Sequence, residues 1–257
     1  MIGDQLQVGH IEMMKQWAVQ AGRMARDWQD HVNGTLKSDN TPVSEADLAV
    51  ERFLVEEIQA SFPGHQIIAE EAGISGPASD WTWAVDPIDG TKAFIRGKPV
   101  WGVSIGLLYQ CVPVAGVIAL PVSQDLFWGW AGGAFWNDRP LDRLLAQDYE
   151  DEQLFLAVHS HAAEQHALRY PRLKASGSTV AHLAYLSAGL AVGVLTRRVH
   201  VWDLAAGIAI LGQAGYAIEY LSGRPLDLRP LMDGRKCAEE VLATRPEWMA
   251  GLRAQIL

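Results

Sequence analysis

The stretch Pro99 to Gln124 contains no charged residue, and it limits the folds that this chain can adopt. It is long enough for a membrane helix, which needs about 20 predominantly apolar residues. However, Val103, Ile105 and Leu107 alternate along it, and Tyr109 to Pro113 interrupts it. Alternation together with many glycines and β-branched residues is typical of strands. We therefore predict two adjacent strands here and no membrane span.

The part of the chain before this pair reads as helices followed by strands. Apolar residues at spacings of three and four predict an amphipathic helix over about Gln5 to His31. A second helix begins at Ser44, and Pro63-Gly64 ends it. A run of strands after two helices indicates an antiparallel sheet in this half. The strands are expected at 66–69, 81–85, within 99–124, and at 125–130.

Beyond a charge-rich segment at 138–153, strands and helices alternate. We place the boundary between two halves near Asp148, which gives an N-terminal α+β half of residues 1–147 and a C-terminal α/β half of residues 148–257. Alternation predicts a mixed α/β fold in which the second half packs against the first. The expected strands lie at 154–158, 191–195, 217–220 and 240–243, and the expected helices at 180–188, 202–214 and 246–256.

The charge balance excludes several classes of partner. Lysine and arginine number 21 against 30 acidic residues, a net charge of −9, and such a chain repels nucleic-acid phosphates and anionic lipid. Cys111 and Cys237 fit neither a disulfide framework nor a thiolate metal site. The N-terminus lacks the basic and apolar segments of a secretory signal. We expect a cytoplasmic protein with neither a nucleic-acid nor a membrane partner.

The most informative motif is Asp-Pro-Ile-Asp-Gly-Thr at 86–91, which follows an apolar strand. Asp86 and Asp89 lie three positions apart beside a proline that restricts φ and a glycine that permits a tight turn. Both carboxylates can therefore converge on a hard cation. The amides of Gly90 and Thr91 would then face an anion from a helix N-terminus. The alternative is an ordinary turn in which Asp89 only caps the helix.

Other carboxylates help to decide between these interpretations. Glu70 and Glu71 close an apolar strand, and Asp203 stands at the start of a helix. Ligand sites in α/β folds gather at the edge where strands end. Clustered with Asp86 and Asp89, these side chains would repel one another unless cations neutralised them. The alternatives are a helix cap for Asp203 and a solvated or supporting position for Glu71.

A polar loop from Lys37 leads into the second helix and contains Asp47. Ser44 and Asp47 fit a capping box, in which each side chain satisfies a backbone N–H at the helix start. The functional interpretation is that Asp47 orients the hydroxyl of Thr91. Both interpretations can hold at once.

These motifs resemble those of the inositol monophosphatase superfamily of Mg²⁺-dependent, lithium-sensitive phosphatases. That family carries an Asp, then Glu-Glu, then Asp-Pro-Ile-Asp-Gly-Thr, then Trp-Asp-x-x-x-Gly. The matching positions in this chain are, in order, Asp47, Glu70-Glu71, 86–91 and 202–207. The resemblance covers the whole chain and implies a layered α-β-α-β-α sandwich with the active site between its halves.

The resemblance also implies a set of metal ligands for two or three Mg²⁺ ions. Glu70, Asp86 and the carbonyl of Ile88 would bind a first ion. Asp86, Asp89 and Asp203 would bind a second, and Glu70 would contact a third through water. Oxygen-only ligands suit Mg²⁺, which retains bound waters.

The catalytic roles implied by the resemblance follow from this set. A water on the first metal, oriented by Thr91 with Asp47 behind it, would attack phosphorus in line, and the second metal would stabilise the departing alkoxide. Glu70 would assist from the metal side. Asp89, Gly90 and Thr91 would contact the substrate phosphate. The implied activity is that of a phosphoric monoester hydrolase acting on a small molecule.

The substrate stays open among three candidates. Inositol-type members commonly carry a Glu seven residues before the Trp-Asp aspartate, where this chain has Thr196. The loop 37–47 is similar to that of adenosine 3′,5′-bisphosphate phosphatases, and Arg197 or Arg198 could bind a second phosphate. The stretch 94–102 is similar to that of histidinol-phosphate phosphatases. We rank an inositol-phosphatase-like activity first, the nucleotide second and histidinol phosphate third.

Two further expectations come from the resemblance. The segment Gly177 to Thr179 is similar to the substrate-side loop of the family, so Ser178 and Thr179 are candidate substrate contacts, with a plain helix cap as the alternative. A homodimer is expected on the same ground. A hypothesis of another class is a catalytically idle relative that acts as a regulatory binding partner.

The remaining histidines and tryptophans have simpler explanations. His159, His161 and His166 have neither zinc-finger nor helical i, i+4 spacing, which argues against a zinc site. His182 and His200 are expected in the core or in a pocket wall. Four tryptophans at period two are expected to pack on one face of a sheet: Trp81, Trp83, Trp128 and Trp130.

Overall fold

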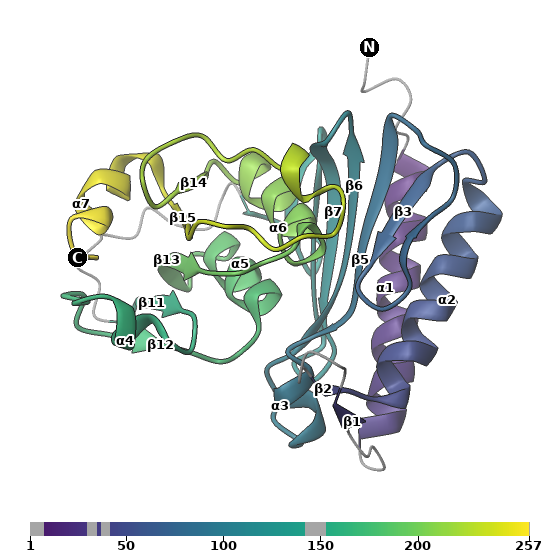
Figure 1. The fold of residues 1–257 in the computed structure, drawn as a ribbon, viewed down its shortest axis with the longest axis horizontal. Coiled ribbons are helices and arrows are strands. Elements are labelled where there is room, and N and C mark those ends of the chain that lie inside the picture. The colour runs from purple at the N-terminus through teal and green to yellow at the C-terminus, as the bar shows by residue number, and fades with distance from the viewer. Residues whose placement is uncertain (1–7, 30–34, 37–41, 142–152, 257) are drawn as a thin grey trace.

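The computed structural model describes residues 8–29, 35–36, 42–141 and 153–256, which form five alternating layers (Figure 1). α1 (Val8–Gln29) and α2 (Glu45–Ser61) cover one face of an eight-stranded sheet. α5 (Thr179–Ser187) and α6 (Val201–Gln213) separate it from a five-stranded sheet. α7 (Met249–Arg253) packs on the outer face of that second sheet. This is the layered α-β-α-β-α sandwich that the sequence predicted.

The eight-stranded sheet has the order β10-β9-β8-β7-β6-β5-β3-β4. The antiparallel prediction is right except for β3 and β5, which pair in parallel. The uncharged stretch forms β6 and β7, as predicted, and both strands are buried over most of their length. The strands are β3 (Gln66–Ala69), β4 (Gly73–Ser75), β5 (Trp81–Asp89), β6 (Gly102–Tyr109), β7 (Val112–Leu120), β8 (Asp125–Trp130), β9 (Gly133–Trp136) and β10 (Arg139–Pro140).

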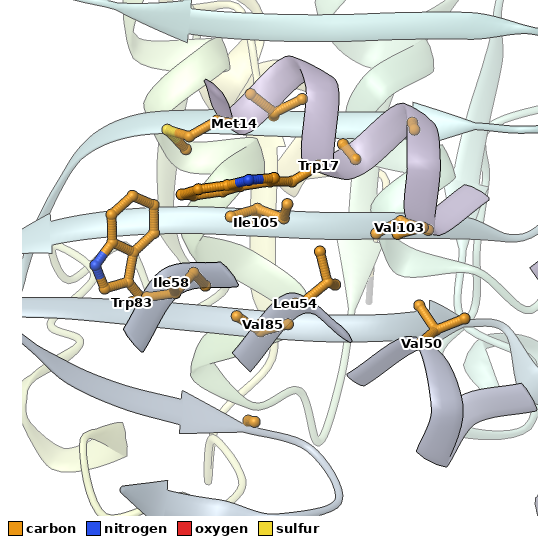
Figure 2. Close-up of a cluster of buried hydrophobic side chains, with 14 of the residues drawn as sticks. Met14, Trp17, Val50, Leu54, Ile58, Trp83, Val85, Val103 and Ile105 are labelled. Carbon is orange, nitrogen blue, oxygen red and sulfur yellow. The ribbon is translucent and has the colours of Figure 1, made fainter. Parts of the chain in front are cut away.

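The outer helices attach to this sheet through a core of large apolar side chains (Figure 2). Met14 and Trp17 of α1 and Leu54 of α2 face the side chains of β5 and β6. Burial of each such side chain contributes about 1.5–3 kcal/mol. The four period-two tryptophans all pack in or against this cluster, which confirms the prediction for them.

The inner helix α6 lies unusually close to the large sheet because two strand residues have no side chain. A Cβ on Gly106 would lie 2.6 Å from the Cβ of Ala205, and a Cβ on Gly116 would lie 2.4 Å from the carbonyl oxygen of Ala206. Glycine at these positions therefore lets the first half of α6 approach β6 and β7. This approach brings the start of α6 next to the C-terminal end of β5.

The five-stranded sheet has the order β12-β11-β13-β15-β14. β11 runs parallel to β12 and β13, whereas β15 is antiparallel to β13 and β14. The C-terminal ends of β11 and β13 and the N-terminal end of β15 therefore share one edge. The strands are β11 (Phe155–Val158), β12 (Leu173–Lys174), β13 (Ala191–Thr196), β14 (Ala217–Tyr220) and β15 (Val241–Thr244).

Several predicted boundaries need correction. The helix expected at 246–256 divides into η4 (Pro246–Trp248) and α7, and β5 continues four residues beyond Val85. Parts of the first predicted helix, the loop 37–41 and the boundary near Asp148 lie outside the described residues. None of the helices in the described part has the length and hydrophobicity required to cross a bilayer. The other short elements are β1 (Thr35–Leu36), β2 (Pro42–Val43), α3 (Thr91–Ile95), α4 (Ala162–Gln165) and η3 (Arg229–Leu231).

Candidate active site

The end of β5 is irregular, and this irregularity gathers two carboxylates. Residues three apart in a regular strand face opposite sides of the sheet. The pairing of β5 with β6 shifts register between Asp86 and Asp89, which releases the strand from that alternation. Asp86 Oδ1 accepts a hydrogen bond from the Ile88 backbone N–H at 3.0 Å. Gly90 follows with φ +94°, and a Cβ there would lie only 3.2 Å from that of Ser178.

Asp203 reaches the same place from the first turn of α6. Its Oδ2 accepts a hydrogen bond from the His200 backbone N–H at 2.6 Å, so the cap considered from the sequence is present. Ser104 of β6 donates to the carbonyl of Trp202 at 3.1 Å and ties the start of the helix to the sheet. The helix cap and the tie together position the Asp203 carboxylate.

Asp86, Asp89 and Asp203 form what we call the carboxylate cluster, because each offers an oxygen and these oxygens lie within 4.8 Å of one another. Burial, followed by the charge of Glu70, raises the pKa of Asp86 well above its usual value. Burial, followed by the charge of Asp89, does the same for the pKa of Asp203. Burial raises the pKa of Asp89 to about 6, although a hydrogen bond from Ser178 opposes it. Burial is the largest cause of all three shifts, and repulsion between carboxylates adds to it for Asp86 and Asp203.

Nothing among the described residues neutralises this cluster with a side-chain cation. No lysine or arginine in the described part forms an ion pair with any of its three members. Carboxylate and carbonyl oxygens are the donors that Mg²⁺ and Ca²⁺ prefer. The cluster therefore fits one or more hard divalent cations by its donor chemistry and by its uncompensated charge.

Thr91 and Asp47 meet beside the cluster. Thr91 Oγ1 lies 3.2 Å from Asp47 Oδ1 and 3.1 Å from the Ile88 carbonyl oxygen, so its single proton has two acceptors. The other Asp47 oxygen accepts from the Ser44 backbone N–H at 2.9 Å and completes the capping box. Asp47 therefore makes both the cap and the contact with Thr91, and its catalytic role stays a prediction. Burial raises the pKa of Asp47, and hydrogen bonds from Ser44 oppose the shift.

The sequence reasoning missed Glu51. This side chain of α2 is only 3% exposed. Its two carboxylate oxygens accept hydrogen bonds from the backbone N–H groups of Glu71 at 2.8 Å and Ala72 at 2.6 Å. Glu51 therefore holds the turn that carries Glu70. The available signal was an acidic residue on the buried stripe of the helix, four positions after Asp47.

A cleft of about 500 Å³ opens beside Glu70, Gly90 and Thr91. Its other walls come from both halves of the chain and include exposed cationic side chains. Within the described part of the chain none of these cations is in an ion pair. We call them the basic rim: Lys92, Arg96, Lys98, Arg197 and Arg198.

This geometry agrees with comparisons to known proteins. The sequence model of the inositol monophosphatase family matches residues 9–254. The chain belongs to the inositol monophosphatase family. It is 34% identical over 234 residues to an inositol-1-monophosphatase from Synechocystis, a match that covers 83% of this chain and 82% of that protein.

Other members of the family carry different names. The chain is 30% identical to the Nus factor SuhB of Escherichia coli, over 76% of this chain and 77% of that protein. Among solved structures, the extragenic suppressor protein SuhB from Bartonella henselae superposes with a TM-score of 0.84 at 28% identity. That superposition covers 96% of this chain and 98% of the other.

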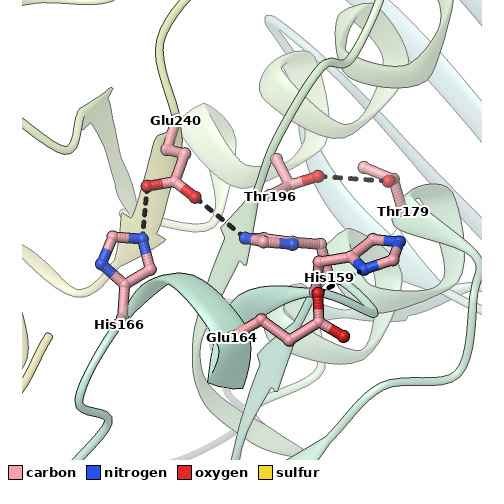
Figure 3. Close-up of polar contacts among 7 residues, drawn as sticks. His159, Glu164, His166, Thr179, Thr196 and Glu240 are labelled. Carbon is pink, nitrogen blue, oxygen red and sulfur yellow. Dashed lines mark hydrogen bonds and ion pairs between the residues drawn. The ribbon is translucent and has the colours of Figure 1, made fainter.

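The expected substrate contacts on the second half of this family member lie in different environments. Ser178 is 1% exposed and donates to Asp89 Oδ2 at 2.5 Å, so it positions Asp89 instead of lining the cleft. Ser178 Oγ also accepts a hydrogen bond from the Ala181 backbone N–H at 3.1 Å, so the helix cap considered from the sequence is present, and a direct contact with substrate stays a prediction. Thr179 Oγ1 lies 3.3 Å from Thr196 Oγ1 (Figure 3). Arg197 is exposed and lines the cleft.

His182 supports the loop that forms this wall. Its Nε2 accepts from the Ser176 backbone N–H at 3.3 Å, which identifies that nitrogen as the unprotonated one. The Ser176 hydroxyl lies 2.7 Å from the same nitrogen. Burial lowers the pKa of His182 to about 4, so the ring is neutral at physiological pH. His182 lies in the core beneath the cleft, as the sequence suggested.

Proposed function

We propose that this member of the inositol monophosphatase family is a Mg²⁺-dependent phosphatase that hydrolyses a small phosphate monoester. The observation that carries the proposal is the carboxylate cluster, whose three oxygens lie within 4.8 Å of one another. A retired enzyme has little reason to keep three clustered, mutually repelling carboxylates, of which Asp86 is buried and the other two are half-buried. The curated relatives named inositol-1-monophosphatase support a substrate of the inositol phosphate type.

The first group of residues binds the metal ions. Asp86, Asp89 and Asp203 would hold the cations, together with Glu70 and the carbonyl of Ile88. Bound Mg²⁺ neutralises charge on the phosphoryl oxygens and supplies an activated water for in-line attack.

The second group of residues orients the reactants. Thr91 has its proton engaged by Asp47 or by the Ile88 carbonyl. Its oxygen lone pairs are therefore available to accept a hydrogen bond from the attacking water. The backbone amides of Gly90 and Thr91, which line the cleft, would donate to the phosphate. Positioning and electrostatics of this kind supply most of what phosphoryl transfer needs.

A second candidate substrate is favoured by the basic rim. Five cations at the mouth of the cleft attract a ligand with a second anionic group, such as adenosine 3′,5′-bisphosphate. Thr196 stands where inositol-type members have a Glu, so this position offers no carboxylate to sugar hydroxyls. Its own hydroxyl is 3.3 Å from that of Thr179, and the residue is only 4% exposed. Histidinol phosphate remains the third candidate.

The test is phosphate release from a panel of monoesters in Mg²⁺ and in chelator. The panel contains an inositol monophosphate, adenosine 3′,5′-bisphosphate and histidinol phosphate. We expect release that requires Mg²⁺, and the ratio of kcat/KM values ranks the substrates. Release that is equal in chelator contradicts the metal-dependent mechanism. No release by folded protein favours a regulatory role, as the relatives named Nus factor suggest.

A further inference from the structure

A second cluster of side chains that could hold a metal ion consists of His159, His166 and Glu240, of which His159 lines the cleft (Figure 3). His159 Nε2 lies 2.9 Å from Glu240 Oε1, and His166 Nε2 lies 2.6 Å from Glu240 Oε2. His159 follows β11, His166 follows α4, and Glu240 precedes β15. The sheet topology brings these ends together, because β11 and β15 run in opposite directions on either side of β13.

We propose that His159, His166 and Glu240 form a binding site for Zn²⁺ or a similar borderline divalent ion. Two imidazoles and one carboxylate are a donor set that zinc accepts with a water as fourth ligand. The offered atoms lie within 4.8 Å of one another. The oxygen-only carboxylate cluster selects hard cations, so the two sites differ in the metals that they prefer.

The surroundings hold these ligands in place. The side chains of His159, Glu240 and His166 are 12%, 13% and 15% exposed, so each is shielded but within reach of solvent. The backbone N–H of Ala162 donates to the His159 carbonyl at 3.0 Å, and the N–H of His166 donates to the Ala162 carbonyl at 2.9 Å. The short α4 therefore fixes both histidines. An ion would enter by separating each Nε2 from its Glu240 oxygen, while the backbone of the three ligands stays in place.

The tautomers of the two histidines also permit metal binding. The Nε2 atoms of His159 and His166 face the Glu240 carboxylate, so either ring, when neutral, donates through Nε2–H in the metal-free protein. Nε2 becomes a metal donor when that proton sits on Nδ1, which requires a change of tautomer and no loss of charge.

The competing explanation is that the cluster is only a hydrogen-bonded clasp between α4 and β15. The substitution H166Q separates the two, because a glutamine amide can still donate to Glu240 but is a poor zinc ligand. H161Q is the matched control. His161 lies in the same segment, is exposed, and pairs with Glu164 at 3.0 Å outside the cluster.

The experiment measures Zn²⁺ bound to the full chain by equilibrium dialysis and elemental analysis, with excess Mg²⁺ present to occupy the carboxylate cluster. We expect one tightly bound Zn²⁺ in the wild type and in H161Q, and an affinity at least about tenfold lower in H166Q. E240Q should lose binding in the same way. Co²⁺ should give the visible absorption of a four-coordinate nitrogen and oxygen site in the wild type and not in H166Q.

The outcomes are decisive in both directions. Absence of bound Zn²⁺ in the wild type overturns the proposal, and so does equal binding by H166Q and the wild type. Circular dichroism and the melting temperature without zinc establish that each variant is folded. If H166Q does not fold, E240Q decides the question. A rise in melting temperature with Zn²⁺ in the wild type and in H161Q, but not in E240Q, supports the site independently of phosphatase activity.

Discussion

The floor and the rim of the cleft have opposite charge and opposite construction. We call the carboxylate cluster the floor, because Asp89 directly precedes Gly90 and Thr91 of the cleft wall; Asp86 is 1% exposed and the pKa of Asp89 is raised to about 6. The rim consists of exposed lysines and arginines from two separate turns. The net charge of −9 is a property of the whole chain and does not reveal that acidic and basic side chains gather in separate regions. Under the proposed function, the floor would bind cations and the rim would attract the anionic substrate from solvent.

The largest effect is expected when the floor loses a charge. Asp86→Asn keeps the shape of the side chain but removes a cation ligand from the centre of the cluster. We expect kcat/KM for phosphate release to fall by roughly 10³-fold, which corresponds to about 4 kcal/mol. Steady-state phosphate release in saturating Mg²⁺ measures the loss.

The same substitution, which lowers activity, should raise the free energy of unfolding when no metal is bound. Burial and neighbouring charges raise the pKa of Asp86 well above its usual value, so the asparagine removes repulsion from the folded state. We expect Asp86→Asn to melt at a higher temperature than the wild type in chelator. Asp80→Asn, an exposed position just before the same strand, is the matched control and should change neither quantity. A variant that is both less active and less stable in chelator would argue against the floor as a strained cation site.

The second effect is the response of stability to pH and to metal. The folded-state pKa of Asp89 is raised from 3.8 to about 6, so the folded state binds more protons than the unfolded state in that interval. Stability without metal should therefore increase as the pH falls from about 7 towards about 5. Mg²⁺ at about 100 times its Kd should add about 2.7 kcal/mol at neutral pH.

Calorimetry in Mg²⁺ and in metal-free buffer at several pH values measures both trends. Because Mg²⁺ binds the ionised carboxylates, its stabilising effect should shrink as the pH falls. The exposed rim is not expected to contribute to this dependence. A stability in metal-free buffer that falls steadily between about pH 7 and pH 5 would contradict the raised pKa values of the floor.

The third effect concerns Glu51, which supports the floor from behind. Glu51→Gln keeps one oxygen acceptor but places an NH₂ group against the second backbone N–H, at Glu71 or Ala72. An unsatisfied buried donor costs about 1–3 kcal/mol. Urea unfolding should show that loss. Activity should fall less than in Asp86→Asn, since Glu70 moves but keeps its charge, and Glu56→Gln, at an exposed position on the same helix, is a suitable control.

The floor could be predicted from the sequence, whereas its support and the rim could not. Asp86 and Asp89 stand in one contiguous turn whose proline and glycine already indicate the geometry. Glu51 looks like any helical glutamate until its burial is known. The rim residues look like ordinary solvated cations, because only the approach of the two halves brings Arg197 near Lys92 in the cleft wall.

The cluster of His159, His166 and Glu240 is a second example of a site that local sequence patterns do not predict. The spacing of His159 and His166 matches no metal motif, and their common partner Glu240 lies 74 residues beyond the second of them. The pairing of strands determines which distant residues come close in space. Local spacing predicts a site only when the ligands share one turn or one helix.

The smallest effect is expected at the rim. It tests whether the rim binds a second anionic group of the substrate. Arg197→Gln should raise KM about tenfold for a bisphosphate substrate, since one charge-assisted contact to a phosphate is worth about 1.5 kcal/mol. The KM for the matching monophosphate, whose single phosphate occupies the floor, should change little, and kcat should change little for either ester. Arg235→Gln, an exposed arginine paired with Asp233, is the control. Because exposed charges are screened by salt, the difference between the two esters should narrow as ionic strength rises. An equal rise in KM for both esters would mean that Arg197 acts on the phosphate at the floor, and the separation of roles between floor and rim would then be wrong.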